Sequence, residues 1–134
     1  MRKQGWEKRL ADFLHAQRDL PFIWGKNDCV LFTSKAANEI TERDLEPEML
    51  GYGEYNKKKA VEILKEHGGE ISGIFDKHFK RKLKTMANRG DIALVKHNNE
   101  KAAGVVIGKY VVCKTLGGLI NVPVNDAIIV WGVD

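Results

Sequence analysis

The sequence predicts an α+β domain in which N-terminal helices pack on a small antiparallel sheet. Two observations predict it. Apolar residues recur at helical spacing in the first part of the chain, whereas short β-branched runs separated by turn residues fill the part after Gly90. Helices followed by strands are typical of the α+β class. With 134 residues the chain is the size of one domain, and we expect residues 1–134 to form it.

The first helix is expected to end before Pro21, because the residue before a proline is disfavoured in helical conformation. One face of it carries Trp6, Leu10, Phe13 and Leu14. Asn27 and Asp28 are good N-caps, so a second helix is expected to begin at Cys29 and to reach Ile40.

Further along, residues 41–55 are expected to form a loop, residues 57–67 a third helix, and residues 71–83 a shorter fourth helix. The double glycine Gly68-Gly69 suits the end of the third helix. The expected strands are short runs of apolar residues, and they span residues 92–95, 105–107, 110–112, 119–122 and 127–133.

Composition excludes several classes of protein. Lys and Arg number 22 against 18 Asp and Glu, and a net charge of +4 is weaker than that of a dedicated nucleic-acid binder. No apolar stretch approaches the roughly 20 residues that span a bilayer, and the first residues do not resemble a signal peptide. The two cysteines, Cys29 and Cys113, are too few for a disulfide scaffold or a structural zinc site.

Cys29 is the first candidate functional residue. A thiol in the first turn of a helix lies at the positive end of the helix dipole, which lowers its pKa and favours the nucleophilic thiolate. Trp24 and Gly25 precede it and are candidates to border a groove, together with the capping Asp28. The alternative is that Cys29 is a packing residue, since cysteine is among the most buried residue types.

Three segments resemble the NlpC/P60 cysteine peptidases, which have a papain-like fold. Residues 21–32 contain an aromatic residue, a glycine and then Asp28-Cys29, like the nucleophile segment of that family. Arg89-Gly90-Asp91 and the apolar residues after it resemble the family's first strand, and residues 102–108 resemble the next. The resemblance implies a papain-like NlpC/P60-type domain with Cys29 as its nucleophile.

A group of short NlpC/P60-like phage and prophage tail proteins is more similar still. These proteins share the segment from Trp24 to Cys29, the Arg89-Gly90-Asp91 strand, a Gly-Gly-Leu turn at Gly117 to Leu119, and the late Trp131. The resemblance implies expression in the cytoplasm of a bacterial host, assembly into a virion tail, and other tail proteins as partners.

The residue at the position of the family's catalytic base is Ala102. A cysteine peptidase needs a base to take the thiol proton, and alanine carries no proton to exchange. The family's orienting polar residue corresponds to Cys113-Lys114. Two of the three catalytic positions are therefore filled by other residue types, and loss of one such group typically removes roughly four orders of magnitude in rate.

His97 is the candidate replacement base. A hairpin with a four-residue loop between 97 and 102 would place these two positions opposite each other, with Cβ atoms about 5 Å apart. The alternative is that His97 is an exposed turn residue beside Asn98-Asn99.

The remaining candidates are less specific. Tyr52 and Tyr55 would line a substrate groove in an enzyme or anchor a partner in a binding module. The basic run of residues 77–84 is expected to be a solvated helix face, with a nucleic-acid site as the alternative. Cys113 is expected to be a core or half-buried strand residue, and a disulfide with Cys29 is conceivable because the family fold brings that strand near the nucleophile helix.

Two functions follow from these observations. The first is a tail-associated scaffold or interaction module with an impaired site. The second is an active cysteine hydrolase that cleaves peptidoglycan stem peptides, with Cys29 as nucleophile and His97 as base. We expect no cofactor, no metal, no nucleic-acid partner and no membrane association.

Overall fold

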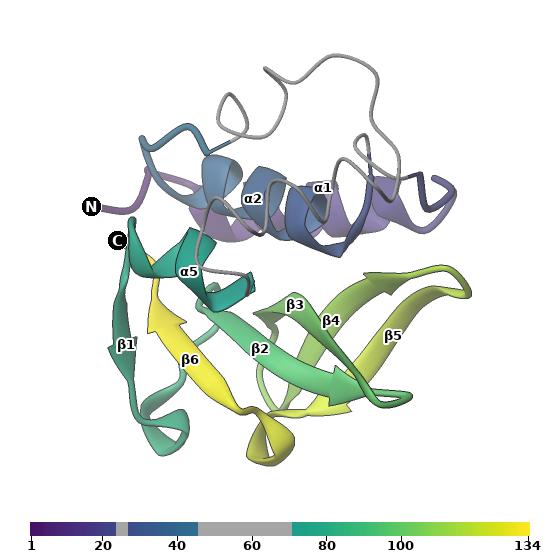
Figure 1. Ribbon diagram of the computed structural model, residues 1–134. Coiled ribbons are helices and arrows are strands. Elements are labelled where there is room, and N and C mark those ends of the chain that lie inside the picture. The colour runs from purple at the N-terminus through teal and green to yellow at the C-terminus, as the bar shows by residue number, and fades with distance from the viewer. Residues whose placement is uncertain (24–26, 46–70) are drawn as a thin grey trace.

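Two N-terminal helices lie over one face of a six-stranded sheet in the computed structural model, which describes residues 1–23, 27–45 and 71–134 (Figure 1). The helices are α1 (Trp6–Gln17) and α2 (Cys29–Ile40), and a short third helix, α5 (Ile71–Asp76), lies beside them over the sheet. The α+β class is therefore confirmed, with helices packed on an antiparallel sheet.

The sheet has the strand order β1-β6-β2-β3-β4-β5, and each pair of neighbours is antiparallel. The strands are β1 (Lys80–Lys82), β2 (Ile92–His97), β3 (Glu100–Val106), β4 (Tyr110–Thr115), β5 (Gly118–Pro123) and β6 (Ile129–Gly132). Two 3-10 turns, η1 (Lys84–Met86) and η2 (Val124–Asp126), connect strands. All five strands expected from the apolar runs are present, with boundaries shifted by a few residues.

Both expected N-terminal helices form where the sequence places them. Asp28 caps α2, because its carboxylate accepts a hydrogen bond from the backbone N–H of Leu31 at 2.9 Å. The chain end also contacts the end of this helix, since the Lys3 backbone N–H donates to the Ile40 carbonyl. The expected helix at 57–67 and most of the expected loop at 41–55 lie outside the described residues.

The fourth helix is shorter than predicted. The apolar spacing of residues 71–83 predicted a helix that continues toward Leu83, but α5 ends at Asp76 and residues 80–82 form β1. Phe79 is still part of the core, being 7% exposed, although a turn and not a continuation of α5 places it there. Strand β1 exists because it pairs with β6, so its backbone partners are about 50 residues away and are invisible to a local pattern.

The hairpin between β2 and β3 has a tighter turn than predicted. Its two turn residues, Asn98 and Asn99, have φ values of 50° and 65°, the left-handed pair of a type I′ turn. Val95 is therefore opposite Ala102, and His97 is opposite Glu100. The predicted pairing of His97 with Ala102 is wrong, because two-residue asparagine turns match the twist of a hairpin better than a longer loop.

The sheet separates two apolar clusters, as strand alternation requires. The cluster on the helix side contains Leu31, Ile40, Leu94, Val105 and Trp131 among its members. The cluster on the opposite side contains Ala93, Val95, Ala102, Val106, Val111, Cys113, Ala127 and Val130. We call this second group the inner cluster. Cys29 packs against both clusters. It therefore lies where the helix layer meets the sheet, near the end of the β3–β4 pairing.

Candidate functional site

Cys29 lies at the point where β3 and β4 separate. The β3–β4 pairing covers only Gly104–Val106 and Val111–Cys113, whereas β3 continues along β2 as far as Glu100. The first turn of α2 approaches β3 at this split, and the Cys29 thiol is hydrogen bonded to the backbone of Ala103. The predicted position of Cys29 at the start of a helix is confirmed.

The thiol is not activated in this position. The pKa of Cys29 is raised to about 11, chiefly by burial and in part by the negative charge of Asp28, against hydrogen bonds from the backbone of Ala103 and of the helix start that lower it. The predicted lowering of this pKa by the helix dipole is wrong here, because desolvation of the thiolate outweighs the N-terminal N–H groups. At neutral pH Cys29 is a protonated thiol.

The base position is apolar in the structure as in the sequence. Ala102 is 9% exposed and belongs to the inner cluster, against which Cys29 packs. His97 is half-buried and lies on the same face of the sheet, two residue pairs further toward the turn, since residues two apart on a strand share a face. Within the described residues no hydrogen bond or ion pair joins His97 to Cys29, and His97 is not among the groups that shift the thiol's pKa.

Lys114, which corresponds to the orienting polar residue of the peptidases, makes structural contacts instead. It is 1% exposed, and its ammonium group donates hydrogen bonds to the backbone carbonyls of Gln17, at 2.7 Å, and of Leu20. Burial lowers the pKa of Lys114. These carbonyls belong to the end of α1, so the lysine caps that helix and holds the start of the connection to α2. A single lysine in an apolar strand was the sequence signal for this contact.

Four of the predicted groove residues cannot be placed. Trp24, Gly25, Tyr52 and Tyr55 lie outside the described residues. Asp28, the fifth, is 2% exposed and serves as the helix cap described above. Cys113, by contrast, is placed as expected: it is fully buried in β4, and the structure holds both cysteines as free thiols.

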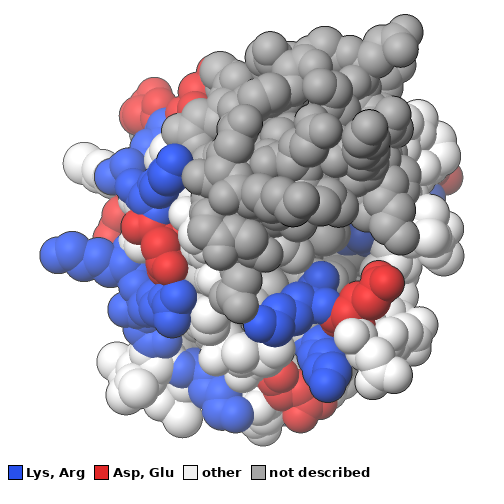
Figure 2. Space-filling view, viewed as in Figure 1, with Lys and Arg blue, Asp and Glu red and all other residues white. Residues whose placement is uncertain are grey.

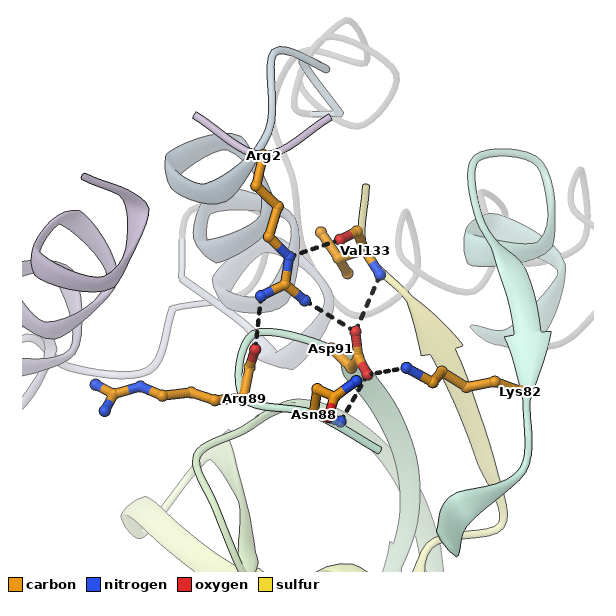
Figure 3. Close-up of polar contacts among 6 residues, drawn as sticks. All are labelled: Arg2, Lys82, Asn88, Arg89, Asp91 and Val133. Atoms are coloured by element: carbon orange, nitrogen blue, oxygen red, sulfur yellow. Dashed lines mark hydrogen bonds and ion pairs between the residues drawn. The ribbon is translucent and has the colours of Figure 1, made fainter. Parts of the chain in front are cut away.

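A second polar site, which the sequence alone did not identify as one, surrounds Asp91 (Figure 3). Its carboxylate is 1% exposed and accepts hydrogen bonds from Arg2 at 3.0 Å and from Lys82 at 2.7 Å. It also accepts from the backbone N–H groups of Asn88 and Val133. Figure 3 shows these four donors converging on the carboxylate. We call Asp91, Arg2, Lys82 and the backbone of Asn88 and Val133 the Asp91 network.

Contacts of Arg2 account for the other two residues of the Arg89-Gly90-Asp91 motif. Arg2 also donates to the carbonyls of Arg89 and Val133 and lies over the Trp6 ring at 4.3 Å. Gly90 has φ +93°, and a Cβ there would come within 2.9 Å of the Arg2 guanidinium. The motif therefore fastens the N-terminal segment to the last strand. An open pocket of about 370 Å³ adjoins this network, but both of its cations are already paired with Asp91.

The basic run of residues 77–84 is not a helix face, which corrects that expectation. Residues 80–82 form the edge strand β1, and Arg81 pairs with Asp76 while Lys82 pairs with Asp91. Lys84 donates to the carbonyl of Asn125. Figure 2 shows basic and acidic side chains interspersed over the described part of this face, so the run does not form a continuous basic patch there.

No group of three or more histidine, cysteine, aspartate or glutamate side chains in the described residues is placed to hold a metal ion. Among the same residues, no helix has the length and apolar character needed to cross a membrane.

Comparison with known proteins assigns nearly the whole chain to one family. A family model described as a domain of unknown function, DUF6950, matches residues 1–133. No curated protein matches the chain. Because the match includes the N-terminal segment, the three described α-helices and the six described strands, it covers the Cys29 site and the Asp91 network together.

Proposed function

Because the chain belongs to the DUF6950 family, whose function is unknown, we propose its role from its own residues: a catalytically impaired domain of the papain-like NlpC/P60 type that acts as a scaffold or interaction module in a phage or prophage tail. The observation that carries the proposal is the state of Cys29. It sits at a helix start against a sheet, where a nucleophile belongs, yet among the described residues it packs against an apolar cluster that includes Ala102 rather than against a base.

The chemistry supports an impaired site. Thiol attack on a peptide requires removal of the thiol proton and its later delivery to the leaving amine. A pKa of about 11 leaves about one thiol in ten thousand ionised at pH 7, and no neighbouring imidazole compensates within the described residues. In the part of the chain that the structure describes, the site therefore lacks the group that performs both proton transfers.

The tail assignment rests on sequence resemblance. The segment from Trp24 to Cys29, the Arg89 to Asp91 strand, the Gly117 to Leu119 turn and Trp131 together resemble the short tail-associated group. In this proposal the protein is made in the cytoplasm of a bacterial host and joins other tail proteins at the tail tip or hub. Nucleic acid and membrane have no part in it.

A second function, hydrolysis of peptidoglycan stem peptides, is favoured by one observation. His97 and Ala102 share a face of the hairpin and are diagonal neighbours, a relation that typically separates Cβ atoms by about 7 Å. A rotation of the His97 side chain toward the thiol during substrate binding would supply a base. This alternative makes Cys29 the nucleophile and predicts a histidine-dependent reaction.

The experiment that separates the two functions is alkylation of the reduced protein with iodoacetamide, followed by mass spectrometry. The scaffold predicts that Cys29 at pH 7.5 reacts at least about 100-fold more slowly than a thiol of pKa 9.0, because its thiolate fraction is that much smaller. The hydrolase predicts rapid labelling that His97→Ala slows, while the exposed control His15→Ala leaves it unchanged. Cleavage of a stem peptide that Cys29→Ala abolishes would overturn the scaffold proposal.

The tail partnership needs its own experiment. The chain is co-expressed with a phage tail-tip or hub protein, and the pair is purified by a tag on either one. We expect a stable complex that persists with Cys29→Ala, since the proposed role does not use the thiol. If no tail protein co-purifies from either direction, the tail assignment is wrong.

A further inference from the structure

Cys29 and Cys113 contact neighbouring residues of one strand. Cys113 is paired with Gly104, and a Cβ built on that glycine would lie 2.6 Å from the Cys113 Sγ. The sulfur therefore lies directly over the space that the missing side chain leaves. The Cys29 thiol is hydrogen bonded at Ala103, the residue before. Two thiols from distant parts of the chain thus lie beside adjacent residues of β3, where β3 and β4 separate.

Packing and electrostatics place the two sulfurs in one environment. Cys113 is a member of the inner cluster, and Cys29 packs against that cluster. Burial raises the pKa of Cys113, and the negative charge of an ionised Cys29 also raises it, as expected for two groups in one poorly solvated region. The strand residues beside this pair, Ala102, Ala103 and Gly104, are small, so no large side chain of β3 stands between the two cysteines.

We propose that Cys29 and Cys113 are a redox pair, which closes to an intramolecular disulfide when the protein meets a small-molecule disulfide such as oxidised glutathione. The bond would join the first turn of α2 to β4, and so lock the helix layer to the sheet at the split. It would enclose roughly 85 residues of chain, a loop long enough for a large effect on the unfolded state.

The reaction is a thiol–disulfide exchange in two steps. The more accessible Cys29 loses its proton to solvent and attacks one sulfur of oxidised glutathione, which releases one glutathione thiolate and leaves a mixed disulfide. Cys113 then loses its proton and attacks the Cys29 sulfur, which releases the second glutathione. Two protein hydrogens are lost, one protein S–S bond forms, and one glutathione disulfide is reduced to two thiols.

The test uses the whole chain and measures its mass after oxidation. Purified reduced protein is incubated with oxidised glutathione at pH 8.5, quenched with acid and digested without reductant. We expect a mass loss of about 2 Da, a linked Cys29–Cys113 peptide pair, and a melting temperature raised by about 10 °C. The same incubation in denaturing urea should form the bond at least tenfold less completely, because the fold no longer brings the sulfurs together.

Two variants serve as matched controls. Cys113→Ala and Cys29→Ala should each show no loss of 2 Da, and Cys113→Ala should stop at the mixed glutathione adduct on Cys29. A wild-type protein that yields only glutathione adducts or disulfide-linked dimers, or that pairs equally well in urea, would overturn the proposal without any variant. The test is independent of the proposed function, which is measured on the fully reduced protein.

Discussion

Asp91 and Cys29 are both short-motif residues placed at the start of a secondary-structure element, and the fold treats them in opposite ways. The carboxylate of Asp91 is 1% exposed and accepts from two cations and two backbone N–H groups. The thiol of Cys29 is also largely removed from water, but its neighbours are mostly apolar and its pKa rises to about 11.

The difference shows what makes a buried polar group functional or structural. Burial is costly for a charge unless donors surround it, and the Asp91 network supplies them from four separate segments. At Cys29 the helix start supplies N–H groups, but no cation or imidazole among the described residues accompanies them. The Asp91 network is therefore a set of ion pairs that stabilises the fold, whereas Cys29 is a protonated thiol at neutral pH.

The strongest way to break this comparison is Asp91→Ala. The change leaves Arg2 and Lys82 without their shared counter-ion and removes the acceptor of two backbone N–H groups, a part-buried one at Asn88 and a buried one at Val133. We expect the free energy of unfolding, measured by urea titration, to fall by about 3–5 kcal/mol.

Asp12→Ala is the matched control for this change. Its carboxylate is 67% exposed and pairs with Lys8 on the surface of α1, so the cost should stay below about 0.5 kcal/mol. If the two variants lose equal stability, the Asp91 network does not fasten the fold.

The second change probes the packing beside the thiols. In Gly104→Ala the new Cβ would lie 2.4 Å from the Val112 carbonyl oxygen and 2.6 Å from the Cys113 sulfur, so strands β3 and β4 must move apart. We expect a loss of about 3 kcal/mol in thermal or urea unfolding. Gly117→Ala, whose nearest neighbour is Thr115 at 3.8 Å, should be near neutral, and equal effects would mean that β3 and β4 do not pack as described.

Asp76 offers an intermediate case, since it is paired but exposed. Its carboxylate accepts from Arg81 and from the indole N–H of Trp131, which is fully buried. Asp76→Ala should cost about 1–3 kcal/mol because the buried indole N–H loses its partner. Arg81→Met, which removes only an exposed ion pair, should cost less than about 1 kcal/mol.

The pH dependence of this case follows from the sign of the shift. The hydrogen bond from Arg81 lowers the pKa of Asp76, so the stabilisation is complete above the unfolded-state value and is lost as pH falls through the lower folded-state value. Urea titrations of wild type and Asp76→Ala should therefore converge in acid. A difference that stays constant into strong acid would assign the effect to packing alone.

The smallest expected effect is that of His97 on the thiol. In the Cys113→Ala background the iodoacetamide rate at Cys29 should rise about tenfold per pH unit from 7 to 10, as expected for a thiol of pKa about 11. His97→Ala should change this rate less than twofold at every pH. A plateau near neutral pH that disappears with His97→Ala would make Cys29 resemble Asp91, a buried group with a charged partner.

Local patterns were sufficient for most elements. The helix spacing at Trp6–Gln17, the Asp28 cap of α2 and the apolar strand runs depend on residues within a few positions of one another. The prediction was wrong where strand pairing determines the secondary structure. Residues 71–83 have helical spacing, yet Lys80–Lys82 form strand β1, which pairs with β6.

The candidate site was predictable in position but not in state. The motif around Cys29 located the thiol at a helix start, and the absence of a histidine at 102 was visible at once. The pKa direction was not, because desolvation depends on what packs around the thiol. The opposition of His97 to Glu100 followed from a two-residue turn, and the Asp91 network joins side chains and backbone groups as far as 89 positions apart.

By itself, the sequence determined an α+β domain with Cys29 at the start of a helix, two asparagines in a turn and no histidine at the base position. Only the tertiary structure decided that the thiol stays protonated, that Asp91 gathers its four donors, and that Cys29 packs against the cluster that contains Cys113. The physical reason is range: helix and turn preferences act between near neighbours in the chain, whereas burial, ion pairing and strand register depend on groups that only folding brings together.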